Sequence, residues 1–195
     1  MLPKKLEKFL KDHGINYDLL EHKTVYTAFD AAQTLKRKLE EIAKTLAIKA
    51  DKKYALIVLP ASHKADLNKL KKMLKADKLE IVKETEMAKA LNVKPGAVTP
   101  FGKFHNVPVY IDKSLLKTKL IVASTGSFTE SVLMKAKDLL ETGAEVVGAF
   151  AKKHNFNKTR KQKSKKTSAK NVKAGAEKKS VKKKTKPAGK RDRKK

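Results

Sequence analysis

The chain has 195 residues, enough for one ordinary domain, and it carries 48 Lys and Arg against 20 Asp and Glu, a formal net charge of +28. The absence of cysteine excludes disulfide scaffolds, iron–sulfur clusters, thiolate zinc sites and cysteine nucleophiles. The longest apolar runs, such as Tyr54 to Ala61, are about eight residues long and too short to span a bilayer.

Positive charge is concentrated in the last part of the chain. Residues 1–151 hold 27 basic and 18 acidic side chains, whereas residues 152–195 hold 21 basic and 2 acidic ones. Because the second segment has almost no large apolar side chain after Phe156, we predict a folded domain over 1–151 and a disordered tail over 152–195. Dense lysine charge favours nucleic acid as the partner, through phosphate contacts that do not read base sequence. An aid to solubility is the alternative function of this segment.

Apolar spacing and turn residues predict interleaved helices and strands, with no internal repeat. In chain order, the expected elements are a helix over 3–13, a strand over 16–21, a helix over 27–38, strands over 42–48 and 53–60, a helix over 66–74, a strand over 79–83, a helix over 84–91, a loop over 94–105, strands over 107–112 and 119–124, a helix over 130–142 and a strand over 145–150. This order predicts an α/β chain of the α+β type, built on a mixed sheet.

The common signatures of metal, nucleotide and hydrolase sites are missing from the sequence. It contains no P-loop, no G-x-G-x-x-G, no G-x-S-x-G and no pair of histidines at metal-ligand spacing. We therefore expect neither a metal nor a cofactor. The histidines are His13, His22, His63, His105 and His154. The first residues lack the apolar core of a signal peptide, so a cytoplasmic location is expected.

Lys44 interrupts an otherwise apolar strand. Alternation along the strand places it on the same face as Ile42, Leu46 and Ile48, which is the more apolar face. Such a lysine either extends outward to solvent or lies in a pocket with a function. In a chain this rich in lysine, the pattern alone favours the outward orientation.

Two segments rich in small residues could approach a ligand closely. The loop from Gly96 to Gly102 has two glycines and Pro100, so its backbone N–H groups could face an oxyanion or a carbonyl. The turn from Ser124 to Ser127 follows an apolar strand and precedes an expected helix, where ligands often bind. The alternatives are a tight connection for the loop and ordinary helix capping for the turn.

In their order and spacing, these features resemble the YbaK/prolyl-tRNA-synthetase-associated domain family over about residues 3–151. The motifs that carry the resemblance are Asp30-Ala31-Ala32 in a helix, the following Lys44-Thr45-Leu46, the apolar strand that ends at Pro60, Asp66-Leu67 at the next helix, the G-x-x-x-P-x-G loop from Gly96 to Gly102 and the Ser124-x-Gly126 turn. The resemblance implies a mixed sheet closed into a barrel-like body flanked by helices.

The family consists of aminoacyl-tRNA deacylases, so the resemblance also implies hydrolysis of the ester that joins a wrong amino acid to the terminal ribose of a tRNA. It implies tRNA as a partner, an aminoacyl-tRNA synthetase as a second one, and no membrane. Lys44 matches the central functional lysine of the family. The implied substrate-binding residues are Thr27, Thr45, Gly96, Ala97, Pro100, Gly102, Ser124, Gly126 and Ser131. Some members have an aspartate early in the last helix, where this chain has Ser131.

An aminoacyl ester is already activated, so its hydrolysis needs chiefly positioning and stabilisation of the developing oxyanion. Lys44 would supply positive charge, and N–H groups of the Gly96 loop would orient the carbonyl. The sequence shows no general base, and the resemblance implies help from a ribose hydroxyl of the tRNA. Alanine, cysteine, serine and threonine all stay open as the amino acid removed. The alternatives are a nonenzymatic nucleic-acid-binding module with the same fold and a histone-like DNA-compacting protein.

Overall fold

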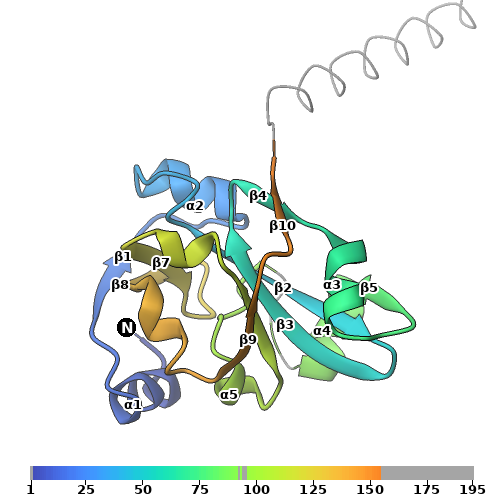
Figure 1. Ribbon diagram of the computed structural model, residues 1–195. Helices are drawn as coiled ribbons and strands as arrows, with labels where there is room; N and C mark the ends of the chain where they lie inside the picture. Colours follow the sequence, from blue (N-terminus) through green and yellow to red (C-terminus); the bar gives the residue numbers. More distant parts are fainter. Residues whose placement is uncertain (1, 92, 94–95, 155–195) are drawn as a thin grey trace, which may run out of the picture. The chain divides into compact units, whose positions relative to one another are not determined.

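The computed structural model describes residues 2–154 except 92, 94 and 95, and Figure 1 shows the arrangement of their elements. The helices are α1 (Lys4–Asp12), α2 (Ala28–Thr34), α3 (Leu67–Met73), α4 (Glu84–Leu91) and α5 (Gly102–His105), with short 3-10 helices η1 (Leu115–Lys117) and η2 (Ala136–Leu139). The strands are β1 (Tyr17–Glu21), β2 (Ala43–Ala50), β3 (Lys53–Pro60), β4 (His63–Ala65), β5 (Leu79–Ile81), β6 (Val109–Asp112), β7 (Leu120–Ser124), β8 (Glu130–Lys135), β9 (Ala144–Gly148) and β10 (Ala151–Lys153).

The described strands form three sheets, which confirms the mixed α+β class. A five-stranded sheet has the order β5-β2-β3-β6-β9, a three-stranded sheet the order β1-β8-β7, and β4 pairs with β10. In the large sheet β2 runs antiparallel to β3 and β5, while β6 runs parallel to β3 and β9. A parallel bridge joins Ile42, the residue before β2, to Val122 on β7, and so links the two larger sheets. Closure into a barrel stays a prediction, because no single closed sheet forms among the described strands.

The long apolar run of β3 is buried on both faces of the sheet. Leu56 and Val58 pack into the main core, whereas Ile57 and Leu59 pack into a second cluster on the other face. A strand that is covered on both faces has a continuous run of apolar residues in its sequence, rather than alternating apolar and polar residues. This strand therefore lies at the centre of the fold, and it forms an antiparallel hairpin with β2 (Figure 1). Lys44 lies on β2, opposite Leu59.

The predicted helix over 130–142 is wrong. Residues 130–135 form strand β8, and only a short 3-10 helix follows it. Strand β8 pairs with β1 on one side and β7 on the other, and every residue from Glu130 to Met134 is buried. Because the strand is central and covered on both faces, its apolar residues are consecutive, and this spacing also matches a buried helix.

The structure differs from the prediction at several shorter segments. The helix predicted over 27–38 ends at Thr34, shortly before Lys36 takes a positive φ of 52°. The predicted loop over 94–105 contains the one-turn helix α5. Strands β4 and β10 were not predicted, and β10 continues to Lys153, two residues past the predicted domain boundary. From residue 155 onward, the predicted disordered tail lies outside the described residues. None of the helices within the described part of the chain has the length and apolar character to cross a bilayer.

Candidate functional site

A cavity of about 320 Å³ lies where the three-stranded sheet, the first half of β2 and the segment around α2 meet. Its walls are largely apolar, with Ile42, Val98 and Val122 among the lining residues. Six of the ten residues that the sequence singled out also line it, which are Thr27, Lys44, Thr45, Gly96, Ser124 and Ser131. Segments far apart in the sequence thus bring one cation and several hydroxyl groups to an apolar cavity.

The other four predicted residues do not line the cavity. Ala97 and Pro100 are buried, and Gly126 takes a φ of +90° beside the backbone of Ala97. Gly102 has a packing role, because a side-chain carbon there would overlap the side chain of Val109. These positions shape the loop and the turn, whereas the cavity surface comes from their neighbours.

Lys44 lies half-buried on β2 and faces the cavity. Its Nζ donates a hydrogen bond to the carbonyl oxygen of His63, at the start of β4. Burial of the ammonium holds the pKa of Lys44 below its ordinary value, and the nearby Lys64 cation lowers it further. Leu46 and Ile48 of the same strand pack with the second apolar cluster. Of the two orientations that the sequence allowed, the structure shows the lysine in a pocket.

Gly96 brings the predicted loop against the segment before α2. It takes a φ of +80°, and a side-chain carbon at this position would lie 2.6 Å from the carbonyl oxygen of Tyr26. The ring of Tyr26 pairs with that of Phe128, with centroids 5.2 Å apart, at the same edge of the cavity. Only glycine permits both the backbone conformation and this close approach.

The segment before α2 is fixed by its own helix cap. The Thr27 hydroxyl accepts a hydrogen bond from the backbone N–H of Asp30 at 3.1 Å, and the Asp30 carboxylate accepts one from the N–H of Thr27, also at 3.1 Å. This reciprocal capping box fixes the start of the helix. It therefore holds Thr27 and the preceding Tyr26 in place at the cavity.

Ser124 and Ser131 lie directly opposite each other on β7 and β8. The Ser124 hydroxyl accepts a hydrogen bond from the N–H of Gly126 at 3.2 Å, which closes the turn that follows β7. Ser131 is only 6% exposed and makes a 2.9 Å hydrogen bond with Nε2 of His22. The two serines form the polar wall of the cavity.

His22 was not among the predicted site residues. The sequence shows it as one of five histidines without metal spacing, and Ser131 is 109 positions away. The pair meets because β1 and β8 are antiparallel neighbours, with Leu20 opposite Ser131. Only a correct pairing of these strands could have revealed it, and the predicted helix over 130–142 concealed that pairing.

Further positive charge lies beside Lys44, on the paired strands β4 and β10. Lys64 is directly opposite Lys152 in their register, and Lys152 also forms a 2.7 Å ion pair with Asp66. The pKa of His154 is lowered, first by desolvation and then by the cations of Lys64 and Lys44. Among the described residues no three His, Asp or Glu side chains gather as metal ligands would.

Comparison with known proteins identifies the family of the chain. Residues 22–142 match the family model of the aminoacyl-tRNA editing domain. The prolyl-tRNA editing protein ProX of Acetoanaerobium sticklandii is 29% identical over 136 residues, which are 67% of this chain and 83% of that protein. The proline–tRNA ligase of Bacillus subtilis is 29% identical over 113 residues, 58% of this chain but only 18% of the ligase.

Solved structures share the fold. The hypothetical protein APE2540 superposes with a TM-score of 0.70 at 22% identity and covers 76% of this chain and 100% of its own. A candidate trans-editing enzyme for prolyl tRNA synthetase superposes with a TM-score of 0.67 at 24% identity, covering 79% of this chain and 100% of its own. With the family model spanning more than half of the residues, the chain belongs to the aminoacyl-tRNA editing domain family.

Proposed function

We propose that this protein hydrolyses the ester bond of a mischarged aminoacyl-tRNA, acting on the tRNA after its release from a synthetase. The observation that carries the proposal is Lys44, a half-buried cation on an apolar cavity whose other polar groups are neutral hydroxyls. The names of the relatives, a prolyl-tRNA editing protein and proline–tRNA ligases, favour the tRNA for proline as the substrate. The same names favour a prolyl-tRNA synthetase as a partner.

In this proposal the charge of Lys44 holds the terminal ribose and phosphate of the tRNA at the cavity. The apolar walls receive the amino-acid side chain, and the backbone around Gly96 orients the ester carbonyl. At about 320 Å³ the cavity is at the small end of ligand sites, which span about 300–1,000 Å³. Selection is then mainly by size, and one methylene contributes only about 1–3 kcal/mol of discrimination.

Weak discrimination in the cavity makes separate binding of the tRNA useful. The 21 basic residues of segment 152–195 supply contacts to phosphates, which raise the local concentration of substrate without adding contacts in the cavity. Because β10 ends at Lys153, the matching truncation is after His154 rather than at 151. Truncation there should weaken tRNA binding and flatten its salt dependence, while the preference among amino acids stays the same. Equal salt slopes for the two proteins would refute this role.

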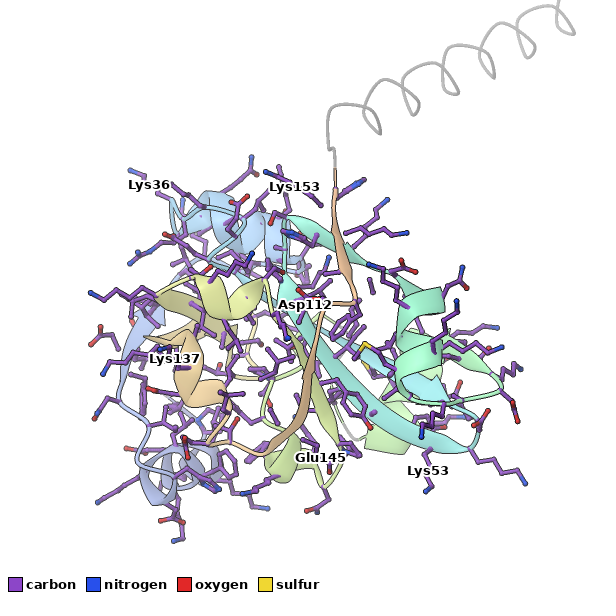
Figure 2. The ribbon with its side chains drawn as sticks, in the orientation of Figure 1. Lys36, Lys53, Asp112, Lys137, Glu145 and Lys153 are labelled. Carbon is purple, nitrogen blue, oxygen red and sulfur yellow. The ribbon has the colours of Figure 1, made fainter. Side chains whose placement is uncertain are left out.

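The test of the activity is deacylation of a panel of mischarged tRNAs, with alanine, cysteine, serine and threonine each attached to the tRNA for proline. Wild-type protein, Lys44→Ala and Lys53→Ala are compared. Lys53 is the control because it is exposed and begins β3, whereas Lys44 pairs with Leu59 near the other end of that strand (Figure 2). We expect hydrolysis of one or a few substrates, lost in Lys44→Ala and kept in Lys53→Ala. No hydrolysis by the wild type above the spontaneous rate would favour the nonenzymatic binding module.

A further inference from the structure

The contact between His22 and Ser131 has a defined direction of proton donation. Nδ1 of His22 lies 2.9 Å from the carbonyl oxygen of Lys23, and Nε2 lies 2.9 Å from Oγ of Ser131. A carbonyl oxygen can only accept a hydrogen bond, so in the neutral ring Nδ1 carries the proton. Nε2 then presents its lone pair to the serine, and the Ser131 hydroxyl donates to it.

Backbone pairing on both strands holds the two side chains in this geometry. The N–H of His22 donates to the carbonyl of Thr129 at 2.9 Å, which extends the β1–β8 ladder by one bond beyond Glu21. The N–H of Val25 donates to the carbonyl of Phe128, also at 2.9 Å. Ser131 lies within β8, between β1 and β7, so its hydroxyl is fixed on the wall of the cavity.

Two other contacts between a hydroxyl and an imidazole occur among the described residues. The Ser62 hydroxyl lies 2.9 Å from Nδ1 of His63, and the Thr99 hydroxyl lies 2.7 Å from Nε2 of His105. Neither Ser62 nor Thr99 lines the cavity that contains Lys44. Of these three contacts, the one at Ser131 thus combines an oriented imidazole with a hydroxyl on the cavity surface.

The other described side chains that line the cavity offer no imidazole or carboxylate to accept a proton. Lys44 is a cation that donates to the carbonyl of His63, and the remaining polar side chains of the lining are hydroxyls. An alcohol becomes a useful proton carrier when an adjacent base accepts its proton. The arrangement of hydroxyl, imidazole and orienting carbonyl meets that requirement.

We infer that His22, through the Ser131 hydroxyl, is the proton acceptor for the water that hydrolyses the ester. The water gives a proton to Oγ of Ser131 as Ser131 gives its own proton to Nε2 of His22, and the resulting hydroxide adds to the ester carbonyl carbon. Collapse of the tetrahedral intermediate breaks the bond to the ribose oxygen, which takes the proton back from His22 through Ser131. The products are the free amino acid and the tRNA. This inference rests on the proposed function.

Charged groups flank the imidazole on both strands. Glu21 and Lys23 are its neighbours in sequence, and Glu130 lies opposite Glu21 on β8. The Lys44 cation lines the cavity that Ser131 also lines. Only the neutral ring can accept a proton, so the rate should fall in acid that protonates the ring.

The experiment measures single-turnover deacylation against pH for the full chain, using the substrate that the wild type hydrolyses best. His22→Gln, His22→Ala, Ser131→Ala and the double variant of His22→Gln with Ser131→Ala are compared with His13→Gln. His13 is a matched control because its Nδ1 also bonds a backbone carbonyl, that of Phe9 at 2.8 Å, and it does not line the cavity. Circular dichroism and urea unfolding check that each variant is folded.

We expect His22→Gln and Ser131→Ala each to lower the rate about 10²- to 10⁴-fold, which is the typical contribution of general acid–base catalysis. The double variant should be no slower than either single one, because the two residues act as a unit. The acid limb of the pH profile should disappear in His22→Gln, and added imidazole should restore part of the rate of His22→Ala. A merely structural role of the histidine would produce neither effect.

Rates of the His22 and Ser131 variants within about threefold of the wild type would overturn the inference, as would an unchanged acid limb in His22→Gln. An acyl group trapped on Ser131 would overturn the relay through water and make Ser131 the nucleophile. The inference fails separately from the proposed function when the wild type is active, Lys44→Ala is inactive and the His22 variants are unaffected. A wild type that hydrolyses no substrate contradicts both.

Discussion

Asp112 joins the end of β6 to the start of β10, and its replacement by asparagine should destabilise the protein. The carboxylate is 2% exposed, and Figure 2 shows it in the interior beside the chain that leads into β10. One of its oxygens accepts hydrogen bonds from the backbone N–H and the hydroxyl of Ser114. The other accepts from the N–H groups of Phe150 and Ala151, at 2.7 and 2.6 Å.

The size of the effect follows from these contacts. Asparagine keeps the shape of the side chain but has one oxygen, so its NH₂ group must face one of the two pairs of donors. The favoured flip points the NH₂ group at Ser114, because the Ser114 hydroxyl can turn and accept from it. Only the N–H of Ser114 then loses its acceptor, and such a loss costs about 1–3 kcal/mol. We therefore expect Asp112→Asn to lower the free energy of unfolding by about 1–3 kcal/mol, a substantial part of the 5–15 kcal/mol typical of a folded domain.

Urea unfolding of the full chain, followed by far-ultraviolet circular dichroism, measures this free energy. Asp18→Asn is the control, because it makes the same chemical change at an exposed position of β1. The control should stay within about 0.5 kcal/mol of the wild type, as surface substitutions generally do. A loss below about 1 kcal/mol in Asp112→Asn would refute the reasoning, because it would show that the protein does not need a second acceptor oxygen at this position.

Three further substitutions test other parts of the structure by the same unfolding measurement. Gly102→Ala should cost about 1–3 kcal/mol by overpacking against Val109, and an unchanged midpoint would contradict that close contact. Thr27→Ala removes the cap shared with Asp30 and should cost about 1 kcal/mol. Folding lowers the pKa of Lys44 below its ordinary 10.5, so between the two pKa values the unfolded chain binds more protons than the folded protein. The free energy of unfolding of the wild type, relative to that of Lys44→Met, should therefore rise with pH over this window. A difference that stays constant from pH 7 to 10.5 would refute this linkage.

The sequence was sufficient to predict the features that depend on local patterns. Strands β2 and β3 were predicted from two apolar runs, and Lys44 stands out because it interrupts the first of them. Gly96 was identified from its turn chemistry, and its positive φ supports that reasoning. These features need only neighbours along the chain.

The missed features depend on contacts between distant residues. The apolar spacing of β8 predicts a helix, and only its pairing with β1 and β7 on the two sides shows that it is a strand. The same pairing brings His22 to Ser131, so both the wrong helix and the missed histidine have one cause. Strand β10 is hidden for another reason, because its lysines belong by composition to the basic segment that follows. Its pairing with β4 stabilises what the composition alone would leave unfolded.

The pairing of β1 with β8 also has a consequence during synthesis of the protein. His22 precedes its partner Ser131 by 109 residues, which at a translation rate of about 5–20 residues per second is a delay of roughly 5–20 s. Throughout that interval β1 has no strand to pair with, and its backbone is open to wrong partners. Asp18 and Glu21 give this short strand negative charge, which discourages pairing with other chains. The cavity therefore forms late, only after nearly the whole domain has been synthesised.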